Sequence, residues 1–222
     1  MEFFNSQAGT QAVNSVASTG IVERMAFLKK VYGLLTVSLL VAIVGANIGQ
    51  SLNPGLMLPL FIVEIAMVFV AMAVRRKPVW NLVALFAFTG LSGLTLGPVM
   101  LVYDAAVIQE AMVLTAVIFA SLTMYVIISR KDFSFLSGFL ITGLVVVIIG
   151  SLLNVFLFQS PMGEFVISAA GVLLFSGFIL YDTSNILRNY EIEDYTAATL
   201  SLYLDVINLF LMLLRLLGGN RD

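Results

Sequence analysis

Three acidic side chains lie inside long apolar stretches of a chain that is 60% hydrophobic and contains no histidine. They are Glu64, Asp182 and Asp205. An ionised carboxylate at the centre of a bilayer costs about 3 kcal/mol or more, so acids in such places usually mark ion or proton pathways. These residues are therefore the first candidates for chemistry, and movement of ions or protons is the chemistry they favour.

Asp182 and Asp205 are expected at the same depth. Asp182 lies six residues before Arg188, and Asp205 lies nine residues after Thr196. At a rise of about 1.5 Å per residue, both acids lie roughly 9–14 Å from the one short connection between their helices. If these two helices are antiparallel neighbours, the two carboxyl groups meet.

Each aspartate also belongs to a polar stripe on one helix face. The stripes are Asp182, Asn185 and Asn189 on one helix, and Ser201, Asp205 and Asn208 on the other. Turned toward each other, they would form an oxygen-rich surface. Asn and Ser side chains also join membrane helices by hydrogen bonds, so packing is the alternative for these supporting residues.

A neighbouring pair of carboxyl groups would work as a pH sensor without histidine. Two carboxylates about 4 Å apart repel by roughly 4 kcal/mol at an effective dielectric constant near 20. The pair Asp182 and Asp205 is therefore expected to share one proton and to titrate as a unit. Loss of that proton would push the helices apart or admit a cation. The alternative is two separate buried acids with packing roles.

The second apolar segment carries Glu64 and, eleven residues later, Arg75. Eleven residues return to nearly the same helix face, but the two lie about 16 Å apart along the axis, too far to pair. We expect Arg75 to reach the aspartate pair and to hold a gate shut. The alternatives are that Arg75 is an ordinary anchor at the membrane edge and that Glu64 is a hydrogen-bonded structural acid.

The composition is that of an integral membrane protein. Charged residues make up 11% of the chain, against about 25% in soluble proteins, and the mean hydropathy is +1.06. Cysteine is absent, which excludes disulfides and thiolate metal sites. A net charge of -2 does not favour nucleic acid as a partner. We expect the lipid bilayer as the surroundings and no cofactor.

Seven apolar segments are long enough to span a membrane as helices. They cover residues 31–52, 56–74, 79–103, 105–128, 135–158, 163–187 and 197–217. Such long runs favour helices over a β-barrel, whose strands alternate over about ten residues. We therefore expect an all-α membrane protein with one seven-helix domain over residues 25–222. Residues 1–24 are expected to form a flexible polar tail.

Lysine and arginine lie before the first segment and after the second, fourth and sixth, while the other connections contain neither. The positive-inside rule therefore predicts a cytoplasmic N-terminus. Arg215 lies outside if the last segment crosses fully, which we favour, and inside if it re-enters.

In the third segment, Gly93 and Gly97 favour close helix packing, and a helix break at Gly97-Pro98 is the alternative.

Several motifs resemble those of the Bax inhibitor-1 (TMBIM) family. Residues 181–186 (YDTSNI) and 201–210 (SLYLDVINLF) are similar to the end of its members, and residues 93–98 (GLTLGP) to the motif of their third helix. Residues 130–136 (RKDFSFL) are similar to the bacterial YccA/YetJ branch, which implies a bacterial inner membrane. The resemblance extends over nearly everything after about residue 25.

The resemblance implies seven transmembrane helices, with six surrounding a central C-terminal helix. It also implies a pH-sensitive calcium leak, with calcium as the transported ion. Asp182 and Asp205 occupy the positions of the aspartate pair that governs the leak and contacts the metal. Arg75 takes the place of a second-helix arginine that latches the closed state, and Glu64 that of an acid on the same helix.

Two other functions are considered. The chain could regulate another membrane protein, as some bacterial relatives modulate a membrane protease, or act on a cell-death or stress pathway component. The chain ends without the lysine-rich tail of animal and plant members, so functions that depend on this tail are not expected. Intramembrane aspartyl proteases also carry aspartates on successive helices, but their second motif is Gly-x-Gly-Asp. Here Tyr203 and Leu204 precede Asp205, so we expect no enzyme.

Overall fold

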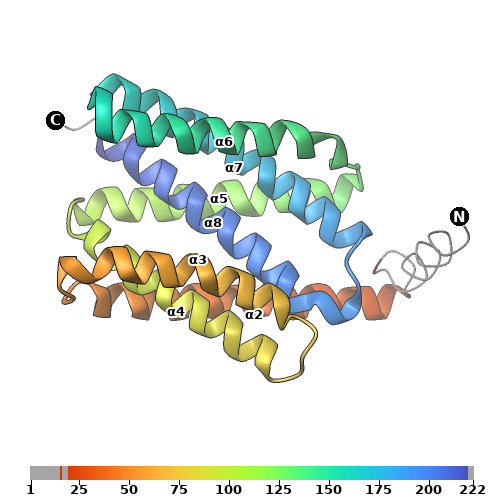
Figure 1. The fold of residues 1–222 in the computed structure, drawn as a ribbon. Coiled ribbons are helices and arrows are strands. Elements are labelled where there is room, and N and C mark those ends of the chain that lie inside the picture. The colour runs from red at the N-terminus through yellow and green to blue at the C-terminus, as the bar shows by residue number, and fades with distance from the viewer. Residues whose placement is uncertain (1–15, 17–19, 220–222) are drawn as a thin grey trace, which may run out of the picture. The chain divides into compact units, whose positions relative to one another are not determined.

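The computed structural model describes residue 16 and residues 20–219, and every regular element in that part is helical (Figure 1). The predicted tail falls largely outside the described residues. The elements are α2 (Ile21–Gly49), η2 (Pro54–Leu56), α3 (Met57–Ala73), α4 (Trp80–Met100), α5 (Ala105–Ser129), η3 (Ser134–Leu136), α6 (Ser137–Leu153), η4 (Asn154–Phe158), α7 (Pro161–Arg188), η5 (Ile192–Asp194) and α8 (Tyr195–Gly218). The prediction of an all-α membrane protein with seven main helices is confirmed.

Six of the apolar helical stretches are long enough to cross a membrane, and α3 is a shorter apolar helix of 17 residues. A length of 17 residues is at the lower end of the range for a spanning helix. α2 begins at Ile21, ten residues before the predicted span, because the helix continues through polar residues such as Glu23 and Lys30. The membrane-spanning length is therefore only part of this helix.

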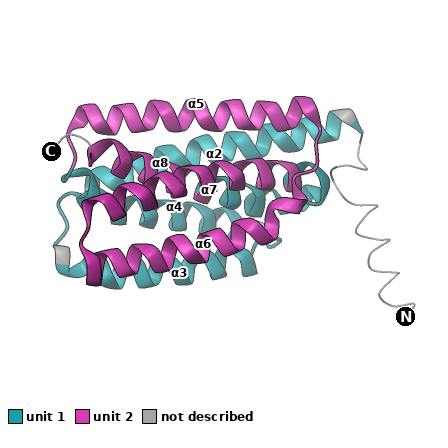
Figure 2. Cartoon of the chain, turned by 90° about the horizontal axis from the view of Figure 1, so that it is seen from above, with its two compact units in different colours: residues 1–102, 186–203 teal, residues 103–185, 204–222 magenta. Residues whose placement is uncertain are grey.

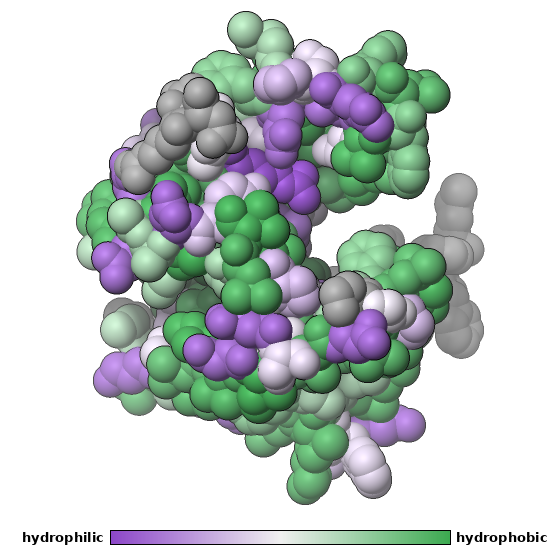
Figure 3. All heavy atoms as spheres, turned by 90° about the vertical axis from the view of Figure 1, so that its left-hand side faces the viewer, coloured by the Kyte–Doolittle hydropathy of each residue, from purple (hydrophilic) through white to green (hydrophobic). Residues whose placement is uncertain are grey.

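Large hydrophobic side chains cover the outside of the helices. Phe156, Phe139 and Leu173 are 74%, 70% and 75% exposed, and many others are similar. Much of the face drawn in Figure 3 is correspondingly hydrophobic. An apolar surface of this extent would aggregate in water and is suited to lipid. Together with the helix lengths, it identifies an integral membrane protein.

The chain divides into two compact units (Figure 2). Unit 1 contains residues 1–102 and 186–203, and unit 2 contains residues 103–185 and 204–222. The division passes through α7 and α8, so each of these helices contributes to both units. The single domain expected for residues 25–222 stays a prediction.

Within unit 1, α2 and α4 approach closely at a set of glycines that we call the glycine interface. Its members are Gly45, Gly49, Gly90, Gly93 and Gly97. A Cβ atom on Gly93 would collide with the backbone of Ala42, and one on Gly97 with the backbone of Gly49. Small residues permit this approach between membrane helices. α4 continues past Pro98 to Met100, so the packing interpretation is confirmed and the helix break is wrong.

Within unit 2, α7 packs closely on both α6 and α8. A Cβ atom on Gly171 of α7 would collide with Met212 of α8, and one on Gly177 with Leu140 of α6. Ser184 of α7 accepts a hydrogen bond from the backbone N–H of Phe133 (3.2 Å), which ties the connection after α5 to α7. These contacts fix α7 and α8 side by side where the candidate site lies.

α8 runs between two different sets of connections. At its start, Asp194 binds arginines of the α3–α4 connection, which is rich in positive charge. Near its end, Arg215 shares a pocket with Ser160 of the α6–α7 connection, which contains neither Lys nor Arg. Its 24 residues extend about 36 Å, more than the hydrocarbon thickness of about 30 Å. This length is sufficient for a full crossing, which stays a prediction.

Candidate functional site

The structure brings the side chains of Asp182 on α7 and Asp205 on α8 together in unit 2, close enough for their carboxyl groups to interact. An ionised carboxylate has no hydrogen to donate, so a hydrogen bond between two carboxyl groups requires a proton on one of them. The shared proton and the function of the pair as a pH sensor both stay predictions.

The position of the pair follows from the lengths of the helices. Asp182 lies six residues before the last residue of α7, Arg188, and Asp205 lies ten residues after the first residue of α8, Tyr195. The short η5 segment reverses the chain between them. α7 and α8 also touch at Gly171 and Met212, so the two helices are neighbours within unit 2.

The surroundings of Asp205 are dry. Its side chain is 5% exposed, and its Oδ2 atom is buried without a hydrogen-bond partner. Its neighbours on α8, Leu202, Val206 and Leu209, are buried as well. A second negative charge here would lack both water and hydrogen bonds, which is costly in a low-dielectric interior.

Arg75 binds a different acid. Its Nε atom lies 3.2 Å from Oδ1 of Asp194, at the start of α8 in unit 1. Asp182 and Asp205 belong to unit 2, and no ion pair within the described part of the chain involves them. The latch proposed for Arg75 therefore stays a prediction, while its observed partner is Asp194.

Arg76 makes the strongest ion pairs of this cluster. Its Nε and Nη2 atoms donate to the two carboxylate oxygens of Asp194 at 2.9 and 2.7 Å, and Nη2 also lies 3.1 Å from Glu191. The hydrogen bond to Asp194 raises the pKa of the Arg76 guanidinium above its ordinary value. Sequence reasoning missed these partners, because acids such as Glu191 and Asp194 are ordinary in a short connection, even one predicted on the same side as Arg75 and Arg76.

Further contacts hold the start of α8 within unit 1. The backbone carbonyl of Arg75 accepts hydrogen bonds from Thr196 (3.1 Å) and from the Asn81 amide (3.2 Å). Asn81 also donates to the hydroxyl of Tyr195 (3.0 Å), and the Lys30 ammonium lies 3.3 Å from the centre of the Tyr195 ring. The cluster around Asp194 is thus a structural junction between α2, α8 and the α3–α4 connection.

Glu64 is half-buried and accepts a hydrogen bond from Thr95 of α4, at 2.7 Å. This contact is the one expected of a hydrogen-bonded structural acid. Any function of Glu64 in a pathway stays a prediction.

The supporting polar residues make mainly local contacts. The Asn208 amide donates to the carbonyl of Leu204 in its own helix (2.8 Å), and Ser201 lies 3.3 Å from the hydroxyl of Tyr190. Asn185 is half-buried one turn after Asp182. The described residues contain no group of three or more Asp, Glu, His or Cys side chains that could hold a metal. Calcium at the pair would therefore need amide, hydroxyl, carbonyl or water oxygens as well.

Comparison with known proteins gives consistent matches over nearly the whole chain. The family model described as "Inhibitor of apoptosis-promoting Bax1" matches residues 24–222. The "Modulator of FtsH protease YccA" of Escherichia coli (strain K12) is 38% identical over 92% of this chain and 95% of its own. An "Uncharacterized membrane protein" of Vibrio cholerae is 39% identical over 90% of this chain and 93% of its own. "Bax inhibitor 1" of Schizosaccharomyces pombe is 36% identical over 88% of this chain and 77% of its own.

Proposed function

Because this chain belongs to the Bax inhibitor family of membrane proteins, we propose that it is a pH-sensitive calcium leak gated by Asp182 and Asp205. The proposal is supported by one observation, the close approach of the Asp182 and Asp205 carboxyl groups within long apolar helices. The three ion pairs described above join Arg75 and Arg76 to Asp194 and Glu191 and do not involve the pair.

The gate would work through the shared proton. While the proton is present, the two carboxyl groups attract each other and hold α7 against α8. Once it leaves, two like charges about 4 Å apart repel by roughly 4 kcal/mol at an effective dielectric constant near 20. That repulsion is relieved when the helices separate or when a cation enters between them.

Calcium suits such a site because it takes six to eight oxygen ligands with flexible geometry. Two carboxylates can supply some of these, and water and nearby amide or carbonyl oxygens the rest. A sparse ligand set binds weakly, and conduction requires an ion that leaves as readily as it enters. The bilayer in question would be a bacterial inner membrane, with the N-terminus and the α7–α8 connection on the cytoplasmic side.

Calcium flux into proteoliposomes at about pH 6 to 8 tests this proposal directly. The wild-type flux should depend on pH in this range, and Asp182→Asn or Asp205→Asn should flatten that dependence, because an amide cannot share and release the proton. Glu193→Gln is the matched control, since it removes an exposed acid from the α7–α8 connection. Unchanged pH dependence in both Asn variants would refute the gate.

A second function is favoured by the match to the Escherichia coli protease modulator, which spans 95% of that relative. In this alternative, the chain binds a membrane protease and changes its activity. The same preparations distinguish the two. Wild-type proteoliposomes without calcium flux, together with a membrane protease that copurifies in equal amount, would favour the regulator over the leak.

A further inference from the structure

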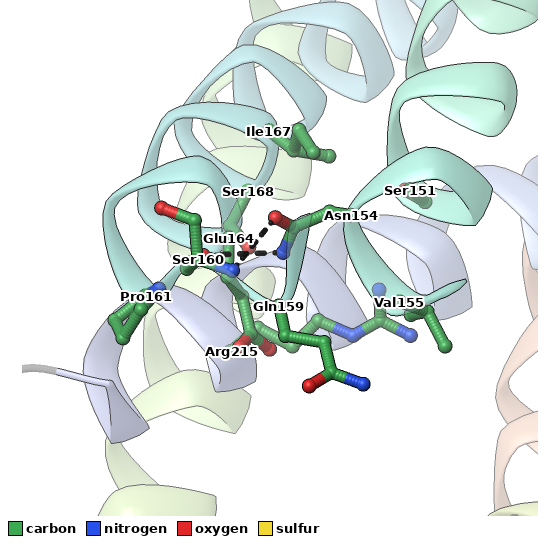
Figure 4. A pocket seen from close by; sticks show the side chains of 10 residues that line it. All are labelled: Ser151, Asn154, Val155, Gln159, Ser160, Pro161, Glu164, Ile167, Ser168 and Arg215. Atoms are coloured by element: carbon green, nitrogen blue, oxygen red, sulfur yellow. Dashed lines mark hydrogen bonds between the residues drawn. The ribbon is translucent and has the colours of Figure 1, made fainter. Parts of the chain in front are cut away.

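A pocket of about 290 Å³ lies where η4 leads into α7, far along the chain from the charged cluster at Asp194. Side chains from η4, α7 and α8 line it (Figure 4). All of its lining residues belong to unit 2. The volume is close to the lower end of the range typical of small-molecule sites, about 300–1,000 Å³.

The rim of this pocket is built by a fixed turn. The Asn154 side chain binds both backbone groups of Ser160, accepting from its N–H at 3.1 Å and donating to its carbonyl at 3.2 Å. Gln159 between them has a positive φ of 46°, the left-handed conformation that reverses the chain. Asn154 also begins the π-helical turn η4. The turn is therefore held by specific bonds, and the hollow beside it is preformed.

Two opposite charges face this hollow without pairing. The Arg215 side chain extends from α8 toward Val155 in Figure 4, and Glu164 lines the same pocket from α7. The Arg215 guanidinium is half-buried and makes no ion pair or side-chain hydrogen bond with any described residue. A guanidinium in such a place is suited to bind a phosphate or carboxylate through two N–H groups.

Hydroxyl groups and apolar side chains complete the pocket. Ser151 and Ser168 supply hydroxyls, and Ser168 is buried. Beside the pocket, Phe156, Phe158 and Met162 are 74%, 68% and 70% exposed on an apolar surface. Ends of spanning helices lie at the level of lipid head groups, and such exposed side chains face the acyl chains. The polar hollow thus adjoins an apolar surface, just as the polar head group of a lipid adjoins its acyl chains.

We propose that this pocket binds the phosphoethanolamine head group of a membrane lipid. Arg215 binds the phosphate, and Glu164 accepts hydrogen bonds from the ammonium group. The acyl chains lie along the exposed apolar side chains of η4 and the start of α7. A lipid with both charges satisfies both side chains at once, whereas phosphatidylglycerol offers the phosphate to Arg215 but leaves Glu164 beside its uncharged terminal glycerol.

Native mass spectrometry of the full-length protein in neutral detergent tests the proposal. The probes are dioleoyl phosphatidylethanolamine, phosphatidylglycerol and phosphatidylcholine, and free phosphoethanolamine. The wild type should bind phosphatidylethanolamine most tightly, because its ammonium donates hydrogen bonds that the choline group lacks. Arg215→Gln should weaken binding of all three lipids at least about tenfold, as expected for the loss of a charge-assisted hydrogen bond.

Glu164→Gln gives the more specific result. It should weaken the binding of phosphatidylethanolamine about tenfold and leave the binding of phosphatidylglycerol unchanged, because only the contact with the ammonium group is lost. Lys77→Gln, which removes an exposed cation from the α3–α4 connection, should preserve the order of the lipids. If Arg215→Gln does not fold, the change of lipid preference in Glu164→Gln decides alone.

Three results would overturn the proposal. The first is a wild type without preference among the lipids, and the second is an unchanged preference in Glu164→Gln. The third is free phosphoethanolamine binding as tightly as the lipid, which would assign the pocket to a small soluble ligand instead.

Discussion

Asp194 is the residue on which the arginines of the α3–α4 connection converge. Its side chain is 9% exposed, while those of Arg75 and Arg76 are 42% and 44% exposed. A buried acceptor with two half-exposed donors keeps its hydrogen bonds although solvent screens part of the Coulomb attraction. Because Asp194 immediately precedes α8, these bonds anchor the beginning of that helix.

We predict that Asp194→Asn lowers the free energy of unfolding by about 1–2 kcal/mol. The loss should be smaller than for a fully buried ion pair, because both arginines are partly exposed to solvent. The apparent unfolding temperature in detergent measures this change. Glu193→Gln is the control: it alters an exposed neighbour and should change stability by less than about 0.5 kcal/mol. Equal effects of the two variants would show that the ion pairs do not stabilise the junction.

How much of the site the sequence could predict depends on the kind of residue. Asp182 and Asp205 stand out because each interrupts an apolar run, and their distances from one connection indicate a common depth. Asp194 gives no such signal, since an acid in a short connection is ordinary. The partner of Arg75 could not be predicted for this reason. Which acid Arg75 binds depends on side-chain contacts between separate segments of the chain, and residue spacing within one helix gives no information about such contacts.

At the scale of the elements, the glycine interface determines how α2 and α4 pack. A side chain at Gly93 would meet backbone atoms of Ala42, which cannot rotate away as a flexible side chain can. Gly138 in α6 provides the opposite case, because a Cβ atom there has no neighbour within 4 Å. In the sequence, both residues are simply glycines within apolar segments. In the structure, only Gly93 has no room for a side chain.

Gly93→Ala is therefore expected to destabilise the protein by about 1–3 kcal/mol, through forced movement of α2 away from α4. The matched variant Gly138→Ala should be neutral or stabilising by up to about 1 kcal/mol, because alanine is the better helix former. Apparent unfolding temperatures of both variants give the comparison. A loss in Gly138→Ala as large as in Gly93→Ala would mean that close approach is not the cause.

The existence of seven helices could be predicted from the apolar runs, because a spanning helix must bury about 20 residues in lipid. Where each helix begins and whether it continues through a proline could not be predicted. α2 extends to Ile21 because helical hydrogen bonds continue into water, where apolar patterning ends. α4 passes through Pro98 because neighbouring helices tolerate an interrupted bond there, and sequence alone does not distinguish this from a break.

At the scale of the whole molecule, the charges of the connections predict its orientation. The absence of cysteine makes this easy to test, since any single introduced cysteine is the only thiol. Glu193→Cys in the α7–α8 connection should be protected from a membrane-impermeant maleimide in intact cells. Asp104→Cys in the α4–α5 connection should react, because both positions are exposed and the positive-inside rule predicts them on opposite sides of the membrane.

Labelling in permeabilised cells is the control, in which both thiols should react. The reverse pattern in intact cells would invert the topology and place the aspartate pair near the outer surface. Equal protection of both thiols would contradict the spanning arrangement of the helices between them.

The contact of α2 with α4 also restricts where ions can travel. Their main chains touch at the glycine interface, where a Cβ atom on Gly49, Gly93 or Gly97 would collide with the facing backbone. A contact too close for one additional carbon atom leaves no room for a hydrated cation between these two helices at that place. If the chain conducts calcium as proposed, mutagenesis aimed at the conduction route therefore belongs on surfaces other than this contact.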